Sequence, residues 1–371
     1  MHAPAVHIAH GTCSVLVAYD IGLAIDLAAC ERLLSAMPER AAIRSAPRTP
    51  QYVEYRPAPL HITQEGNALT LGAYRSGTSV EGVLYDFGTL SLTYHIPLHG
   101  PWRGLLELSE VLYDNALLLQ DARQRVEQLL TMVQDTVQRP HIAECVEAYV
   151  IFHIAACTTP CRVEELYSTY AQDIAQVLRA EPMPLSTQEI QEALSHRMMH
   201  GVEDLIVIDW HAALLYGQEV DDIRAVLEFA NVELLETRYL DAQLDVALDQ
   251  AYATLSRRTG RRLRLPGSAS MDLQRIAQMQ VENAMLFEGV NNALKLLGDQ
   301  YLARVYRLAS QRFHLAEWDA SILRKLHTLE SIYSKIADRA TNRRMETLEW
   351  IIIVLIAVSI LLPFFINMPP H

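Results

Sequence analysis

Short apolar runs separated by polar segments fill the first 256 residues, and their spacing predicts alternating strands and helices. SVLVAYDIG (14–22) and AYVIFHIAA (148–156) are almost wholly apolar, which predicts strands buried on both faces. EGVLYDFGTLSLTY (81–94) and DLIVIDWHAALLYG (204–217) have apolar residues on both sides of a polar break, which predicts two strand pairs. Helical patterns follow at 111–119 and 227–235.

These elements recur in the same order, at a spacing of about 125 residues, which predicts an internal duplication. A gapless alignment of the two strand pairs matches Asp86 to Asp209 and Phe87 to Trp210. We therefore expect an α+β fold of two similar β-α-β-β-α units. The first unit covers 1–140, and the second covers 141–256 and runs into a long helix. Chance similarity among apolar strands is the alternative.

The segment 299–349 lacks both Pro and Gly, and the pattern predicts one continuous helix about 76 Å long. Its apolar residues recur at steps of three and four, as in a coiled coil. A second helix of the chain, at 221–256 or 271–297, covers this seam in one interpretation, giving a helical hairpin or coiled-coil stalk over 271–349. In the other interpretation a second copy of the chain covers the seam, which gives a homo-oligomer. The seam residues are Leu315, Trp318, Ile322, Leu326, Leu329, Tyr333 and Ile336.

The segment 257–270 is rich in arginine and contains Gly and Pro, which predicts a loop. One hypothesis is a contact site for RNA or anionic lipid. A solvated loop without a ligand is the plainer interpretation. The arginines are Arg257, Arg258, Arg261, Arg262 and Arg264.

The last apolar run, from Trp350 to Ile366, has 17 residues without a charge. A span of a bilayer takes about 17–25 apolar residues, so the run predicts a single C-terminal transmembrane helix over 350–366. A buried core helix is the alternative. Three arginines precede the run and none follows, so the positive-inside rule predicts that the N-terminal bulk is cytoplasmic. The anchor residues are Trp350, Ile351, Leu355, Leu361 and Phe364, and the arginines are Arg339, Arg343 and Arg344.

Charge and cysteine content narrow the classes of function. The net charge is −13, and the acidic excess lies in residues 1–256, which argues against nucleic-acid binding by that part. Five cysteines without regular spacing indicate a reducing compartment and no disulfide framework. The first residues, MHAPAVHIAHGTC, resemble neither a secretory signal nor a mitochondrial transit peptide.

Motifs for catalysis or metal binding are weak. The sequence has no Walker A pattern, no GxGxxG after a strand and no HExxH. His153, Cys157 and Cys161 share a spacing of four, but Pro160 interrupts them, so buried cysteines are the plainer explanation. Asp86 and Asp209 recur at turns, where Asp is favoured for local hydrogen bonding. We therefore predict no catalytic, metal-binding or cofactor-binding residue, and no cofactor. An enzyme with a site between the two repeated units is the alternative.

The segments RIAQMQVENAMLF, LARVYRLASQRFHLAEWDASILRKLHTLESIYSKIAD and RRMETLEWIIIVLIAVSIL resemble the required-for-meiotic-nuclear-division family, a domain of unknown function. The resemblance covers most of 14–362. Two positions depart from the family's pattern: His211 replaces a glycine and Ser359 an acid.

For mitochondrial members, the resemblance implies an oligomeric inner-membrane protein that supports translation. This chain looks like a bacterial member, which implies single-pass anchoring in the bacterial inner (plasma) membrane. We expect a tail-anchored scaffold or tether of a protein or ribonucleoprotein partner, and we favour this role over that of an enzyme.

Overall fold

The computed structural model describes residues 6–36, 43–45, 57–158, 162–200, 204–218, 220–257 and 300–366. The chain divides into two compact units. The first comprises 1–239 with 282–319, and the second comprises 240–281 with 320–371. Each unit has a hydrophobic core of its own.

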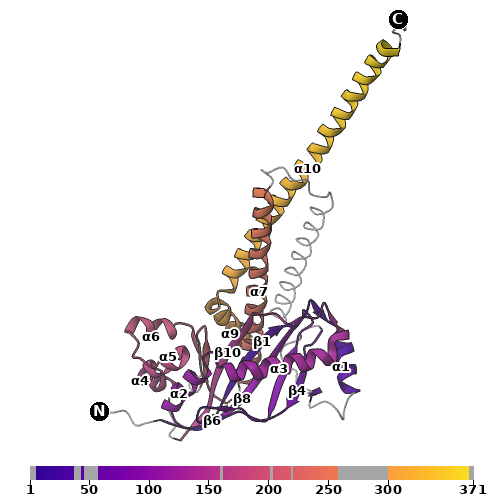
Figure 1. The fold of residues 1–371 in the computed structure, drawn as a ribbon. Helices are drawn as coiled ribbons and strands as arrows, with labels where there is room; N and C mark the ends of the chain where they lie inside the picture. The colour runs from indigo at the N-terminus through magenta and orange to yellow at the C-terminus, as the bar shows by residue number, and fades with distance from the viewer. Residues whose placement is uncertain are drawn as a thin grey trace. The chain divides into compact units, whose positions relative to one another are not determined.

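A nine-stranded mixed sheet forms the centre of the first unit (Figure 1), with strand order β11-β12-β13-β10-β1-β8-β7-β4-β3. Neighbouring strands are antiparallel except for β10 and β13, which are parallel. Two short pairs, β2 with β9 and β5 with β6, lie outside this sheet. The strands are β1 (His7–Asp20), β2 (Ala24–Ile25), β3 (Ile43–Ser45), β4 (Leu60–Glu65), β5 (Thr70–Leu71), β6 (Tyr74–Arg75), β7 (Ser79–Leu84), β8 (Thr89–Pro101), β9 (Val137–Gln138), β10 (Val146–Cys157), β11 (Arg197–His200), β12 (Asp204–Ile208) and β13 (Ala212–Tyr216).

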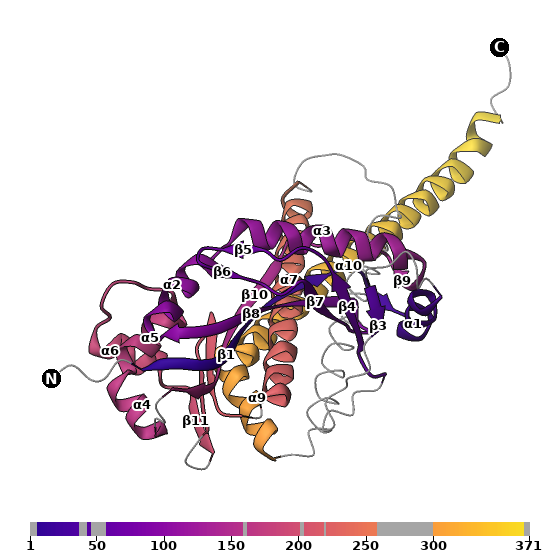
Figure 2. The same ribbon diagram turned by 90° about the horizontal axis from the view of Figure 1, so that it is seen from below.

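Helices cover both faces of the sheet (Figure 2). In β1, Val15 and Val17 contribute to the core on one face, while Leu16 contributes to the core on the other. This burial on two sides explains the almost wholly apolar strands, because neither face is left for polar residues. The first face packs against α1 (Leu27–Ser35), α2 (Arg103–Leu112), α3 (Ala116–Val133), α4 (Val163–Thr169), α5 (Ala171–Arg179) and α6 (Thr187–Ala193), with the short 3-10 helix η1 (Gln134–Thr136) following α3. The second packs against the first part of α7 (Asp221–Arg257) and against α9 (Gln300–Arg312).

The expected pair of similar units is wrong, because both halves contribute to one sheet and their strand directions differ. The two predicted strand pairs are present as β7–β8 and β12–β13. However, β8 is antiparallel to β1, whereas β13 is parallel to β10. Among the described residues, two strands of the sheet (β3 and β4) lie in the chain between β1 and the first pair, but only one (β11) lies between β10 and the second pair. The additional strand in the first half reverses the direction of the strand pair relative to the first strand of that half. The two halves therefore form one mixed sheet, and the fold is mixed α/β rather than α+β.

The second unit contains the last part of α7 and most of α10 (Leu315–Ile366). Its core lies between the two helices and contains Leu240, Leu244, Ala247 and Ala251 from α7, and Ile322, Leu326, Leu329, Ile332 and Tyr333 from α10. Much of the predicted seam is therefore covered by a helix of the same chain. The side chain of Ile336 lies outside the described part, as do Arg258, Arg261, Arg262, Arg264 and the predicted helix over 271–297.

The predicted continuous helix over 299–349 is interrupted near its start. Helix α9 ends at Arg312, and α10 begins at Leu315. Between them His314 has a φ of 55°, in the left-handed region, which a continuous α-helix cannot include. Leu315 and Trp318 consequently pack in the core of the first unit, whereas Ile322 packs in the second.

The predicted transmembrane helix over 350–366 is wrong, together with the single-pass membrane contact, the tail anchor and the inner-membrane localisation derived from it. Within the residues that the structure describes, no helix combines the length and the apolar character needed to cross a bilayer. The uncharged run has 17 residues, which corresponds to about 25 Å of helix, whereas the hydrocarbon core is about 30 Å thick. It forms the last part of α10, and Arg339, Arg343 and Arg344 lie in the same helix.

Candidate functional site

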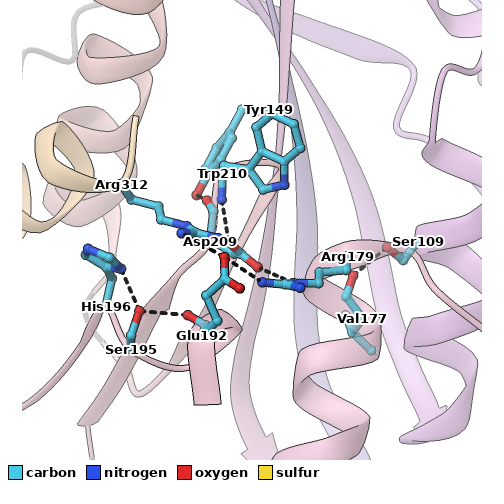
Figure 3. Close-up of polar contacts among 10 residues, drawn as sticks. All are labelled: Ser109, Tyr149, Val177, Arg179, Glu192, Ser195, His196, Asp209, Trp210 and Arg312. Atoms are coloured by element: carbon cyan, nitrogen blue, oxygen red, sulfur yellow. Dashed lines mark hydrogen bonds and ion pairs between the residues drawn. The ribbon is translucent and has the colours of Figure 1, made fainter. Parts of the chain in front are cut away.

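A buried carboxylate organises the strongest candidate site (Figure 3). Asp209 lies in the turn between β12 and β13, and its side chain is fully buried. Its Oδ1 accepts hydrogen bonds from the Arg312 Nε at 2.6 Å and from the Trp210 backbone N–H at 2.9 Å. Its Oδ2 accepts a hydrogen bond from the Arg179 Nε at 3.2 Å. The Arg312 Nη2 also forms an ion pair with Asp209 Oδ1. The Tyr149 hydroxyl donates to the Asp209 carbonyl at 2.9 Å.

Both arginines are the last residues of helices, where the helix dipole favours a positive charge. Arg179 ends α5, and Ala180 follows in the left-handed conformation with a φ of 51°. Arg312 ends α9. The Ser109 hydroxyl donates to the Val177 carbonyl at 2.6 Å, which holds the end of α5 against α2. Elements distant in the sequence thus bring two guanidinium groups to one carboxylate.

A cavity of about 550 Å³ adjoins this cluster, within the range of about 300–1,000 Å³ that is usual for ligand sites. Glu192 Oε1 lies 3.4 Å from Arg179 Nη2 and 3.9 Å from Arg312 Nη1. The Trp210 side chain is 68% exposed. A capping box between Ser186 and Glu189 defines the start of α6, which positions Glu192 one turn later. The lining residues are Arg179, Glu181, Leu185, Glu189, Glu192, Trp210, Arg312 and His314.

Ser195 and His196 lie beside the cavity but are not arranged as a nucleophile and its base. The Ser195 hydroxyl donates to the Glu192 carbonyl at 2.7 Å and lies 2.9 Å from His196 Nδ1. Burial, and the nearby charge of Arg312, lower the pKa of His196 below its ordinary value of 6.5. Because the hydroxyl proton is directed to the carbonyl, the imidazole is not placed to remove it.

A second cluster joins a hydroxyl, an imidazole and a carboxylate. Ser14 Oγ lies 3.1 Å from His95 Nδ1, and His95 Nε2 lies 3.1 Å from Glu81 Oε2. Hydrogen bonding from His95, together with the charge of Arg224, lowers the pKa of Glu81 to about 2. The order of groups is that of a hydrolase triad. However, Ser14 is only 4% exposed, in the central strand β1, so we interpret the cluster as a structural hydrogen-bond network.

The other residues considered for chemistry have local roles. The Asp86 carbonyl, in the β7–β8 turn, accepts from the Ile25 N–H at 2.8 Å. His153 Nε2 lies 2.8 Å from the Gly217 carbonyl, Cys157 is in β10, and Cys161 lies outside the described residues. In the part of the chain that the structure describes, no three or more His, Cys, Asp or Glu residues could together hold a metal ion.

The sequence does not reveal the roles of Arg179, Arg312 and Glu192. One signal is available: Asp209 interrupts the apolar run LIVIDWHAALL, and a buried charge requires partners. The pattern predicts a turn at Asp209, and the structure does place this residue in a turn. The partners cannot be chosen from sequence, because they lie on α5 and α9.

Comparison of the sequence with known proteins identifies the family of this chain. A family model described as "Uncharacterized protein MJ0711, N-terminal domain" matches residues 10–222, which include Arg179 and Asp209 but not Arg312. An uncharacterized protein of Methanocaldococcus jannaschii, MJ0711, is 22% identical over 307 residues, covering 81% of this chain and 83% of that protein. Both descriptions agree with the predicted domain of unknown function. Since the family model matches more than half of the chain, the protein belongs to the MJ0711 N-terminal domain family.

Proposed function

We propose that this protein is a non-enzymatic scaffold that holds a protein partner against the apolar part of α10. One observation carries the proposal: all seven side chains from Trp350 to Ile356 are apolar and between 50% and 67% exposed. Contiguous exposed apolar surface marks interaction sites in proteins. Burying one such large side chain fully contributes about 1.5–3 kcal/mol, so a partner that covers several of them gains substantial affinity.

The polar groups of the first unit also suit binding better than proton transfer. Arg179 and Arg312 are both engaged by Asp209, and Glu192 bridges the same two arginines. The pairing with Asp209 holds the two guanidinium groups in fixed positions, which supports recognition. A general acid or base needs instead a group that is able to exchange its proton near the working pH.

The resemblance to the required-for-meiotic-nuclear-division family extends this proposal to the kind of partner. For the mitochondrial members of that family the resemblance implies support of translation, and by analogy we favour a ribosomal or RNA-bearing complex as the partner. Arg257 at the end of α7, with the four arginines that follow it in sequence, would supply contacts to phosphate. Self-association remains a prediction, now for surface other than the seam residues that α7 covers.

Site-specific photo-crosslinking in cells tests the proposal directly. A photo-reactive amino acid at Ile352, which is 54% exposed, is expected to capture a specific partner. The matched control is the same probe at Glu330, whose side chain is 62% exposed on the same helix. Ribonuclease treatment before capture then distinguishes a partner held through RNA from one held directly.

Ile352→Glu and Leu355→Glu are expected to abolish the captured complex, because each places a charge in the apolar contact. Light scattering on the purified variants separates loss of a partner from loss of self-association. Equal capture from the Ile352 and Glu330 positions, or unchanged capture in both charged variants, contradicts the proposal.

A further inference from the structure

We propose that the cavity beside Asp209 binds a singly charged carboxylate, with Arg179 and Arg312 as its binding residues and Glu192 as an internal competitor. All residues that line this cavity belong to the first unit, and binding there is independent of the scaffold function proposed for α10.

The two guanidinium groups are already oriented for an anion. Asp209 engages the Nε atoms of both arginines, at 3.2 Å from Arg179 and 2.6 Å from Arg312. The Arg179 Nη2 and Arg312 Nη1 atoms face Glu192 on the cavity side. Arginine presents its N–H groups as a rigid fork that fits a carboxylate. Because Asp209 fixes both forks in advance, an incoming ligand loses little entropy in ordering them.

Glu192 shows that a carboxylate fits this position, and also that it is held weakly. Its Oε1 lies 3.4 Å and 3.9 Å from the two arginines, beyond the roughly 2.7–2.9 Å of a good charge-assisted hydrogen bond. The side chain is also 57% exposed, and ion pairs with such exposure contribute little. A ligand carboxylate that approaches the arginines more closely therefore displaces it.

The other lining residues narrow the ligand further. Leu185 and the exposed indole of Trp210 offer apolar surface beside the arginines. Glu181 and Glu189 also line the cavity, and their charges repel a dianion such as phosphate more than a monoanion. The geometry therefore favours a carboxylate on an aromatic or other apolar group. Either a small organic acid or the free C-terminus of a peptide carries that chemistry.

The test is calorimetric titration of the full-length protein with phenylacetate, its uncharged analogue phenylacetamide and inorganic phosphate. Phenylacetate is expected to bind, phenylacetamide to show no binding, and phosphate to bind more weakly than phenylacetate. Glu192→Gln removes the competing charge and keeps every contact of Asp209, so it is expected to fold normally. It should bind phenylacetate about 1.5- to 5-fold more tightly, the range that the loss of an exposed ion pair allows. Glu164→Gln, an exposed glutamate on α4, is the matched control and should leave affinity unchanged.

Two further peptides identify the source of the carboxylate. A hexapeptide ending in a free phenylalanine is compared with the same peptide amidated at its C-terminus. Tighter binding of the free peptide than of phenylacetate assigns the cavity to a protein C-terminus, whereas binding of phenylacetate alone assigns it to a small acid. Equal binding of phenylacetate and phenylacetamide, an unchanged affinity in Glu192→Gln, or no binding of any carboxylate overturns the proposal.

Discussion

We expect a buried glutamate, Glu233, to make the stability of the first unit depend on pH. Glu233 on α7 is only 6% exposed, and its Oε2 accepts a hydrogen bond of 2.6 Å from the Tyr306 hydroxyl on α9. Burial raises the pKa of Glu233 from its ordinary value of 4.5 to about 8, although the bond from Tyr306 opposes this. The folded state therefore holds the Glu233 proton more tightly than the unfolded state. This contribution to stability is complete below about pH 4.5 and is lost as pH rises through about 8.

The size of this contribution to stability depends on the difference between the pKa of Glu233 in the unfolded and folded states. Each pKa unit corresponds to about 1.4 kcal/mol, so the difference between 4.5 and about 8 sets an upper limit of about 5 kcal/mol. Most of this loss, about 3 kcal/mol, is expected by pH 7. Glu233→Gln abolishes the titration but keeps an amide oxygen that accepts from Tyr306. The variant should therefore become more stable than the wild type as pH rises, while the two proteins remain similar near pH 4.

Urea unfolding followed by circular dichroism at pH 5, 7 and 9 measures this difference. Burial also raises the pKa of Asp319, to about 6, but Asp319 is present in both proteins, so most of its effect cancels. Glu110→Gln, at an exposed position of α2, controls for the loss of one charge. The reasoning is refuted if the free energies of unfolding of the wild type and Glu233→Gln change in parallel with pH.

Three further predictions concern other contacts. Asp209→Ala should destabilise the first unit by about 3–5 kcal/mol, because it leaves two arginines near a buried site without their carboxylate. Denaturant unfolding of this variant and of the exposed control Asp249→Ala measures the difference. Equal free energies of unfolding for the two variants would contradict the prediction. Leu329→Ala should lower the free energy of unfolding by about 2–5 kcal/mol, because Leu329 lies in the α7–α10 core. Leu323→Ala, at a side chain that is 54% exposed, should change it by less than about 0.5 kcal/mol. Similar urea midpoints for the two variants would be inconsistent with the packing. A fluorophosphonate probe should leave Ser14 unlabelled in the native protein, because the residue is 4% exposed, and mass-spectrometric detection of the adduct would show instead that the Ser14 cluster is accessible.

Local pattern is a good guide to where strands and helices form. The segments 14–22 and 148–156 fall within or largely overlap β1 and β10, and the two strand pairs form around Asp86 and Asp209. The apolar steps of three and four near residue 326 correspond to buried positions of α10. The interruption at His314 is not predicted, because no Pro or Gly marks it and its φ of 55° is unusual for a residue with a side chain.

Hydrophobic content alone is misleading for the C-terminal run. An uncharged stretch of 17 residues lies at the lower limit of about 17–25 residues for a span, so composition could not decide its role.

The predicted duplication is misleading for a different reason. Similar residues can form similar strand pairs, but the direction in which a pair joins a sheet depends on how many strands precede it.

The sequence by itself indicated where the main strands and helices form and which of their positions are apolar, because the periods of 2 and 3.6 residues depend on near neighbours in the chain. Only the tertiary structure decided that β13 runs parallel to β10, that α7 covers the seam of α10, and that Arg179 and Arg312 meet at Asp209. Each of these pairings joins residues far apart in the chain. They are selected by sheet register and by the need to bury apolar surface and to pair buried charge, which no local spacing records.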